Sequence, residues 1–531
     1  VVIVGLVAVA VYALSLFNMF AYDDVAVISL DKRVHSLSIL RSIFSISYWN
    51  NEAQGLYRPL VTGSFAVDWA VAQNHPGWFH FVNVVWNAAA CILAFLLLAE
   101  LFPIAPALGG ALIFAVHPVH VEAVANIVGR AELMAAAFMF LAALIWLRSR
   151  NRAFIVLAVS TLYMLATMSK ESAIMLPPLF VLLDLAATRL RLDSAGVKAW
   201  LGDRIGPLLA MVAVAALFLI MRAAVIPSLG PSNIDAALEM ASSGPPRFYT
   251  ALQVWPQYLR LLVFPLTLLA DYGPRVLMPI TELSMPVMAA VAILAGALIG
   301  GGAAALRGHG RTALALLWVP IAMLPVSNLL FPIGTILAER TLYLPSFAIA
   351  IAVAAAVAFV DGEAIASRHR RTTLGFLTLV CVAFTARTIV RIPDWKSTQS
   401  IFRAQARTRP DSFRAQWHFA RKAVEARKPR TALELYAKTL RLWPYRSKLL
   451  KESSTYAIKM GDLPFARQIN EQGVHTWPRD VDFRRSLAGV LIDLGDSAQA
   501  AIHVRQGLMI APNDKVLNSM NAALGHWVAK P

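Results

Sequence analysis

The chain has 531 residues, of which 58% are hydrophobic and 15% charged, with a formal net charge of +17. Soluble globular domains carry about 25% charged residues, so this composition excludes an ordinary water-soluble protein. Both cysteines, Cys91 and Cys381, fall within apolar stretches, which excludes a disulfide framework.

Eleven apolar segments follow one another over residues 1–391. A helix of about 17–25 apolar residues spans a bilayer. We therefore predict an all-α fold, a polytopic membrane helical bundle of about eleven spans. The expected spans are 1–16, 78–98, 107–117, 133–147, 153–168, 173–185, 207–225, 286–305, 314–331, 342–360 and 373–389.

The first of these segments has a second interpretation. Because the sequence begins at Val1 without a methionine, we expect a short stretch to precede it. A cleaved signal peptide is the alternative. Against it, the apolar run exceeds a signal peptide's hydrophobic region, and no small-residue cleavage site follows.

Basic residues in the short loops predict the orientation, because cytoplasmic loops carry an excess of Lys and Arg. The opposite short loops carry only Arg130, Lys170 and Arg340. The N-terminus is then cytoplasmic, and the loops 20–77 and 226–285 face outward together with the C-terminal tail. The twelve basic residues on the cytoplasmic side are Arg148, Arg150, Arg152, Arg189, Arg191, Lys198, Arg204, Arg307, Arg311, Arg368, Arg370 and Arg371.

Two stretches of the outward loops are apolar without being predicted to span. Residues 250–270 contain Pro256 and Pro265, which interrupt helical hydrogen bonding, and a twelfth span would place a basic loop outside. We predict a broken, interfacial or re-entrant element there. Residues 37–49 have apolar side chains at 37, 40, 43, 44 and 48, which favours a helix lying in the membrane interface.

The outward loops also hold the candidate site. Four separate loops place charge at the ends of spans that a compact bundle brings together, and ionisable residues at that depth are commonly functional. The Asp271-Tyr272 pair follows the broken element. The candidate residues are Asp23, Asp24, Arg58, His117, His120, Glu122, Arg130, Lys170, Glu171, Arg340 and Tyr343.

Each candidate has a simpler interpretation. Lys170-Glu171 is typical of a solvated pair, and Asp24 could cap the following helix. His117, His120 and Glu122 have the spacing HxxHxE, which differs from HExxH and lacks an obvious fourth ligand, so we predict no metal and no cofactor.

The tail, residues 392–531, is predicted to be a separate domain. Prolines recur every 34 residues at 410, 444, 478 and 512, and alanines at 432, 466 and 500. This period is typical of tetratricopeptide helix pairs, which stack into an α-solenoid, here of about four repeats. From Arg391 onward the chain has 24 Lys or Arg against 12 Asp or Glu. On an outer face this charge favours an acidic protein or anionic membrane lipids over nucleic acid, and a merely soluble basic surface is the alternative.

Taken together, these motifs resemble one family over nearly the whole chain. The Asp-Asp pair and the tail are joined by four further motifs: Tyr-Arg-Pro-Leu at 57–60, His-Pro-Val-His-Val-Glu-Ala-Val at 117–124 with Gly129-Arg130, Lys170-Glu171, and Glu-Arg-Thr-Leu-Tyr-Leu-Pro-Ser at 339–346. The combination resembles the transmembrane and tetratricopeptide-repeat O-mannosyltransferases and their bacterial relatives, within the GT-C glycosyltransferases. The tail is shorter than that of the animal members, which weakens any transfer of their cadherin-like acceptors.

The resemblance implies an inverting membrane enzyme in a bacterial inner membrane. Such enzymes move a sugar, mannose or another hexose, from a polyprenyl-phosphate donor to Ser or Thr hydroxyls of an extracytoplasmic protein. A phosphate leaving group needs positive charge, which Arg58, Arg130, Lys170 and Arg340 would supply. The acceptor hydroxyl needs one general base, for which Asp23 is favoured and Asp24 is second.

Two other classes of function stay open from the sequence. A membrane-anchored repeat protein could be a catalytically idle scaffold or assembly subunit. A transporter is the third class, but we find no inverted internal repeat and no regular polar residues in mid-span.

Overall fold

The computed structural model describes residues 1–50, 55–226, 244–362 and 367–525, and within these ranges it is helical with no strand. The chain divides into two compact units. The membrane unit comprises Val1–Gly273 and Leu277–Ala404, and the repeat unit comprises Pro274–Val276 and Gln405–Pro531. The sequence placed the boundary at 391/392, before Trp395 and Ile401, which are buried in the core of the membrane unit.

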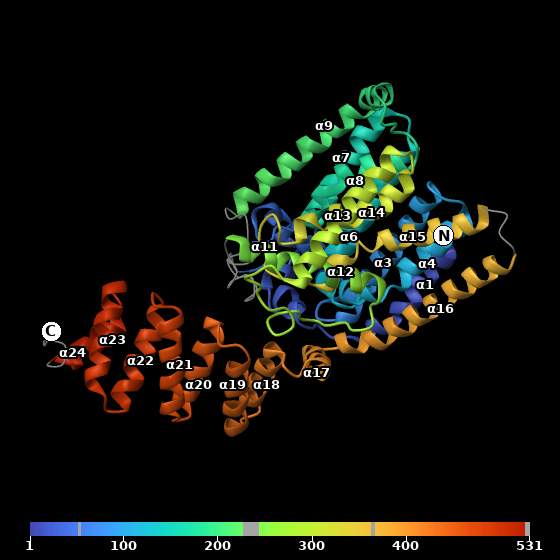
Figure 1. Cartoon of the computed structure of the whole chain (residues 1–531). Coiled ribbons are helices and arrows are strands. Elements are labelled where there is room, and N and C mark those ends of the chain that lie inside the picture. Colours follow the sequence, from blue (N-terminus) through green and yellow to red (C-terminus); the bar gives the residue numbers. More distant parts are fainter. Residues whose placement is uncertain (51–54, 227–243, 363–366, 526–531) are drawn as a thin grey trace. The chain divides into compact units, whose positions relative to one another are not determined.

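Every predicted span overlaps a helix of the membrane unit (Figure 1), although the span predicted at 314–331 runs past the end of its helix at Met323. The all-α membrane bundle is confirmed. These helices are α1 (Val2–Tyr12), α3 (Pro76–Ala99), α4 (Ile104–Val116), α6 (Arg130–Arg148), α7 (Arg152–Ser169), α8 (Leu176–Ala186), α9 (Ser194–Val225), α13 (Met285–Leu306), α14 (Gly310–Met323), α15 (Phe347–Gly362) and α16 (Ser367–Arg391).

The helices differ in whether they are long enough to cross a bilayer. Among the described residues, seven are long and apolar enough, or eight if the bent pair Ile104–Val116 and Pro118–Ala125 forms one span. Val2–Phe17 and Gly310–Val326 are apolar but shorter. The total of eleven crossings therefore stays a prediction that depends on the shorter helices.

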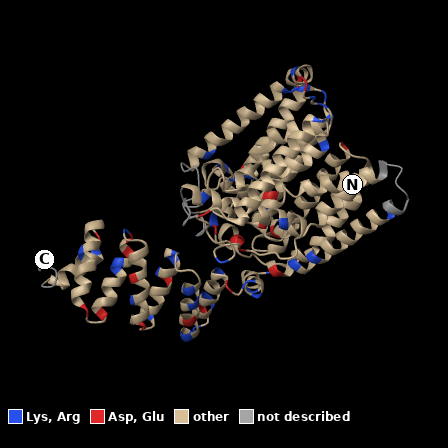
Figure 2. Cartoon of the chain, viewed as in Figure 1, with Lys and Arg blue, Asp and Glu red and all other residues tan. Residues whose placement is uncertain are grey.

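Charge follows the same division (Figure 2). Residues other than Lys, Arg, Asp and Glu make up most of the length of the membrane unit's long helices, whereas charged residues recur along the helices of the repeat unit. This pattern is the one that a lipid-facing bundle and a water-facing repeat unit require.

The apolar element at 250–270 is broken, as predicted. It consists of two nine-residue helices, α11 (Gly244–Leu252) and α12 (Trp255–Val263). Pro256 stands in the first turn of α12, where proline is tolerated, and Pro265 follows its end. The remainder of the expected outward loop includes 227–243, which lie outside the described residues.

The prediction of one interfacial helix over 37–49 is wrong. The stretch forms two short 3₁₀ helices, η4 (Leu37–Arg41) and η5 (Ile43–Ser45). Ile43 is buried while Phe44 is exposed. The break between the two helices is at Ser42, whose hydroxyl donates to the Ile39 carbonyl, so the apolar residues do not form one continuous helical face.

An aromatic cluster lies in the core of the membrane unit, near the C-terminal end of α4 and the N-terminal end of α15. Phe114 of α4, Phe140 of α6 and Phe347 of α15 are buried, with 4.8 Å between the ring centroids of Phe140 and Phe347. Phe114 also contacts the rings of His120, at 4.7 Å, and Tyr343, at 5.4 Å. The cluster therefore supports two of the candidate site residues from beneath.

The repeat unit consists of paired helices that recur every 34 residues, as the sequence predicted (Figure 1). Asp462 and Asp496 cap the second helices of successive pairs, and Asp480 and Asp514 cap the first helices. Its helices are α18 (Phe413–Glu425), α19 (Pro429–Leu442), α20 (Ser447–Lys459), α21 (Leu463–Thr476), α22 (Val481–Asp493), α23 (Ser497–Ile510) and α24 (Lys515–Ala523); α17 (Thr398–Thr408) precedes them. The same local stop and start signals thus recur with each repeat.

The packing of α4 on α15 generates a stability prediction. A Cβ on Gly110 would overlap the backbone carbonyl of Ala350, whereas one on Gly109 would lie 3.9 Å from Val357 Cγ2. Gly110→Ala should lower stability by about 1–3 kcal/mol through overpacking. Gly109→Ala, the matched control, should not. Thermal unfolding in detergent measures both, and equal melting temperatures would contradict this packing.

Candidate functional site

The candidate site lies at the end of the membrane unit that the sequence predicts to face outward, and Arg340 is at its centre. Arg340 lies in the 3₁₀ helix η11 (Glu339–Leu342), and Glu122 lies in the short helix α5 (Val121–Ala125). The Arg340 guanidinium donates to Glu122 Oε1 at 2.5 Å, and its backbone N–H donates to Glu122 Oε2 at 3.0 Å. Arg340 Nη2 lies 4.0 Å from Asp23 Oδ2, so one arginine joins both carboxylates.

The chain before Asp23 is held in an unusual backbone conformation. Tyr22 has a φ of 55°, in the left-handed region that aromatic residues rarely adopt. Its backbone N–H donates to Thr398 Oγ1 at 2.9 Å, and its ring contacts Phe402 at 5.9 Å. Strain of this kind persists only where the surroundings fix it, and here the contacts turn Asp23 towards Arg340.

Asp24 has a different environment from its neighbour. Its side chain is fully buried, and its two oxygens accept backbone N–H bonds from Val128 at 2.9 Å and Ala21 at 3.2 Å. Burial raises the pKa of Asp24 to about 7, although these amides oppose the shift. Asp24 makes no side-chain capping bond to the turn that follows, so the geometry is that of an anchor between two loops.

Two further ion pairs lie in the same region. Arg58, directly before α2 (Pro59–Ala72), bonds to Glu171 at 3.0 Å, and the Tyr57 backbone N–H donates to the same carboxylate at 2.9 Å. Lys170 forms an ion pair with Glu132 of α6. Burial lowers the pKa of Lys170, Glu132 opposes this, and the nearby charges of Arg58 and Arg340 lower it further. Three candidate cations thus share one region.

The charges of this site nearly balance. Arg58, Lys170 and Arg340 are each paired with one glutamate, and Asp23 adds a fourth carboxylate. The sequence analysis missed Glu132, although it stands two residues after Arg130. Within the described part of the chain, Arg58 bonds to Glu171 through its Nε, and its guanidinium lies over the Tyr48 ring.

Arg130 does not join these cations, in contrast to its predicted role. It is fully buried, and Nε donates to Asn83 at 2.8 Å while Nη2 donates to the Phe79 carbonyl at 3.0 Å. Its Nη1 bonds to Asp68 at 2.5 Å. All three guanidinium nitrogens are therefore bonded within the protein, and Arg130 holds α2, α3 and α6 together.

His117, His120 and Tyr343 are also fully buried and bonded within the protein. His117 Nε2 lies 2.9 Å from the Leu262 carbonyl of α12, and His120 Nε2 lies 2.7 Å from Ser346 Oγ. The Tyr343 hydroxyl donates to Asn87 at 2.8 Å. These three side chains fix the wall behind the site, and within the described ranges no group of three His, Cys, Asp or Glu side chains could hold a metal.

Sequence reasoning missed two buried residues beside the site. Tyr48 is 2% exposed, its ring lies 5.3 Å from the Arg58 guanidinium, and burial raises the pKa of its phenol. Glu339, next to Arg340, accepts hydrogen bonds from the Tyr272 hydroxyl at 2.7 Å and from the Leu269 N–H at 2.5 Å. Only their positions in the sequence could have indicated a role in the site. Tyr48 lies in the stretch 37–49, which was predicted to be one helix, and Glu339 begins the motif at 339–346.

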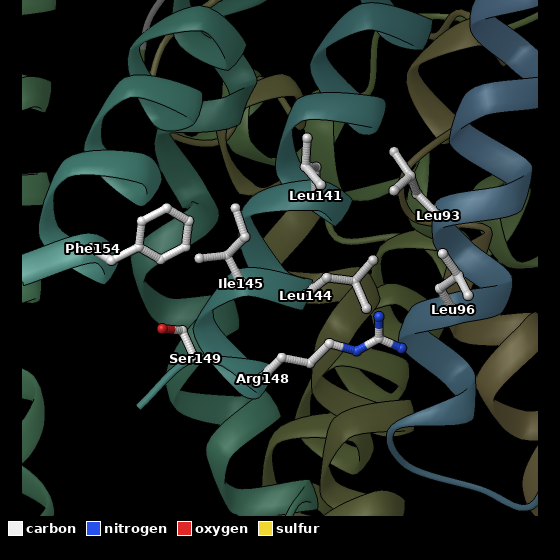
Figure 3. A pocket seen from close by; sticks show the side chains of 8 residues that line it. All are labelled: Leu93, Leu96, Leu141, Leu144, Ile145, Arg148, Ser149 and Phe154. Carbon is white, nitrogen blue, oxygen red and sulfur yellow. The ribbon is translucent and has the colours of Figure 1, made fainter. Parts of the chain in front are cut away.

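An apolar cleft of about 340 Å³ lies apart from this site (Figure 3). Leu93 and Leu96 of α3, Leu144 of α6 and Phe154 of α7 line it, with Arg148 as its one charged side chain. Arg148 bonds to Glu100 at 2.7 Å. The cleft holds none of the predicted site residues, and its leucines suit acyl chains and not a reacting sugar.

Comparisons with known proteins agree with the motifs. No protein-family model matches the sequence. The chain is 28% identical over 432 residues to protein O-mannosyl-transferase TMTC3 of Mus musculus, covering 75% of this chain and 46% of that protein. It is 27% identical over 494 residues to protein O-mannosyl-transferase TMTC4 of Homo sapiens, covering 82% of this chain and 65% of that protein.

The chain resembles protein O-mannosyl-transferases along most of its length. The resemblance read from the motifs is thereby confirmed, and this chain spans about half the length of several of the relatives it matches. Among solved structures, the archaeal oligosaccharyltransferase AglB from Archaeoglobus fulgidus aligns with a TM-score of 0.40 and 14% identity, over 84% of this chain and 59% of that one.

The burial of Arg130 generates a prediction that separates it from the other cations. Arg130→Ala should lower the free energy of unfolding by about 3–5 kcal/mol, because it leaves the buried Asp68 carboxylate unpaired. Removing both charges, in Arg130→Ala with Asp68→Ala, should recover part of that loss. Thermal unfolding in detergent measures both. An Arg130→Ala variant with normal stability and weakened donor binding would return Arg130 to the phosphate-binding set.

Proposed function

We propose that this chain is a membrane glycosyltransferase that moves a hexose, such as mannose, from a polyprenyl-phosphate donor to a Ser or Thr hydroxyl. The observation that carries the proposal is the contact of Asp23 with Arg340, in a group of ion pairs at the outward ends of the helices. The names of the sequence relatives support the same class of reaction.

The proposed reaction is a single displacement that inverts the anomeric carbon. The acceptor oxygen attacks that carbon while Asp23 takes the hydroxyl proton. The bond from the anomeric carbon to the phosphate oxygen breaks, and the phosphate leaves with the electron pair. Arg58 and Arg340 would contact the developing charge directly, with Lys170 behind them, and no general acid is needed for a leaving group that is already a weak base.

The environments of the two aspartates support Asp23 as the base. Asp23 is 24% exposed at its side chain and lies beside a cation, whereas Asp24 is fully buried with both oxygens on backbone amides. A base must reach the hydroxyl that it deprotonates. We therefore assign Asp24 to positioning Asp23 and keep only Asp23 as the catalytic carboxylate.

Replacing each aspartate by asparagine tests this division. Asp23→Asn should keep expression, thermal stability and donor binding but lower turnover about 10²–10⁴-fold, the usual contribution of a general base. Asp24→Asn should lower stability by about 1–3 kcal/mol as well, because an amide nitrogen would face a backbone N–H.

Asp203→Asn is the control, since Asp203 is exposed and pairs with Arg152 at the opposite end of the bundle by the predicted topology. Near-normal transfer by both single variants would remove Asp23 as the base. A wild-type chain that transfers no sugar from any polyprenyl-phosphate donor would favour the scaffold alternative.

The orientation is part of the proposal, because the donor and acceptor must meet outside the cytoplasm. Cysteine labels placed after Arg150 should be protected from an impermeant reagent in intact cells, whereas one placed after Pro410 should react. The expectation rests on twelve basic residues against three in the short loops. Protection of the label after Pro410 would place Asp23 on the cytoplasmic side and overturn the site.

We assign the repeat unit to holding the acceptor protein, with no part in bond cleavage. Deleting residues 411–531 should then lower transfer to a protein more than transfer to a short Ser/Thr peptide, because only the protein loses a second contact. Initial rates with the two acceptors measure the difference. An equal fall for both would make the repeat unit structural.

A further inference from the structure

The repeat unit contains an open groove between α18 and α20. It measures about 580 Å³, and Tyr436 of α19 forms part of its lining together with Tyr456 of α20. The two tyrosine rings lie 5.8 Å apart. A groove of this size with aromatic and charged lining has the dimensions of a ligand site.

Some of the groove's charged side chains are fixed by bonds within the protein. Glu452 accepts hydrogen bonds from Arg421, from the Trp417 indole at 3.0 Å and from the Tyr436 hydroxyl at 2.8 Å. Arg421 also stacks on Trp417, with 4.3 Å between the guanidinium and the ring. This network gives the groove a rigid wall in which the charges of Arg421 and Glu452 offset each other.

Two lysines of the groove are different. Lys448 and Lys459 are exposed and, among the described residues, have no ion pair or side-chain hydrogen bond. Glu425, the other acidic side chain in the lining, bonds to Lys422 at 2.7 Å. Lys451, the third lysine of the lining, is paired with Asp480 and Asp482. The groove therefore presents two uncompensated positive charges, and it lies in the C-terminal part of the chain, which from Arg391 onward carries 24 Lys or Arg against 12 Asp or Glu.

The spacing of these lysines indicates what they would bind. Both belong to α20, eleven residues apart, which is about three turns, so they lie on one face and about 16 Å from each other along the helix. An extended chain covers that distance in about five residues. An extended peptide lying along the open groove beside α20 can therefore place two carboxylates on these lysines.

We propose that this groove binds an extended acidic segment of a partner protein, with carboxylates four or five residues apart that contact Lys448 and Lys459. The proposal extends the assignment of the repeat unit as the part that holds the acceptor. It can be tested by binding alone, so its failure and the failure of sugar transfer are separate results.

The experiment measures binding of fluorescent twelve-residue peptides to the full chain in detergent, by anisotropy at low salt. The probe has two glutamates five residues apart around a Ser/Thr core, and a second peptide has lysines at the same positions. The acidic peptide should bind and the basic one should not. The variant Lys448→Glu with Lys459→Glu should weaken binding by about tenfold or more.

A matched control tests whether the weaker binding results from the change in net charge alone. Lys428→Glu with Lys438→Glu changes the net charge by the same amount at α19, outside the groove lining, and should change binding less than about twofold. Thermal unfolding should be unchanged in both variants, because all four side chains are exposed. Equal weakening by both variants, or no binding of the acidic peptide, would overturn the proposal. Displacement of the peptide by glycerol phosphate would assign the groove to anionic lipid headgroups and overturn it as well.

Discussion

The candidate site depends on one constraint, that a buried carboxylate needs a cation beside it to offset the cost of removing it from water. Glu122 is 1% exposed and is bonded to Arg340 through both its oxygens. This pair joins α5 to η11, which are more than 200 residues apart in sequence. Once Arg340 is fixed in this way, its second Nη atom is the natural partner for Asp23. The arrangement of α5, η11 and the loop that holds Asp23 is therefore tied to the burial of Glu122.

In the proposed site the two adjacent aspartates have different roles: Asp24 holds the loop in place, and Asp23 takes the proton. Tyr22 in a left-handed conformation turns the chain so that Asp24 points inward to the amides of Ala21 and Val128, while Asp23 points to Arg340. The inward carboxylate holds the loop still. In the proposed reaction the other, partly exposed carboxylate would reach the acceptor hydroxyl beside a donor whose lipid part stays in the bilayer, which would account for an acidic pair directly after the first apolar helix.

Part of this arrangement could be predicted from the sequence. The all-α membrane bundle, the break at Pro256 and Pro265 and the 34-residue period of the tail follow from local rules of hydropathy, proline geometry and helix capping. The partners of the charged residues could not be predicted in the same way. The sequence predicts the same outward position for Arg130 and Arg340. Only the packing shows that the Arg130 guanidinium is bonded to Asp68, Asn83 and the Phe79 carbonyl, because these contacts join residues from three separate helices. Tyr48 was missed for a related reason, since serine-backbone bonds break up the expected helix around it.

The near balance of charge in the site has a consequence for the proposed reaction. A sugar phosphodiester brings one negative charge, and the departing phosphate monoester carries a second. In the proposed step the proton that reaches Asp23 removes one negative charge as the phosphate gains one, so the total charge of the site and its substrates is unchanged. Arg340 lies beside Asp23 and is one of the cations assigned to the phosphate. As Asp23 becomes neutral, its hold on Arg340 weakens and the guanidinium becomes more available to the phosphate. In the proposed reaction, the contact between these two residues would therefore couple the removal of the acceptor's proton to the stabilisation of the leaving group.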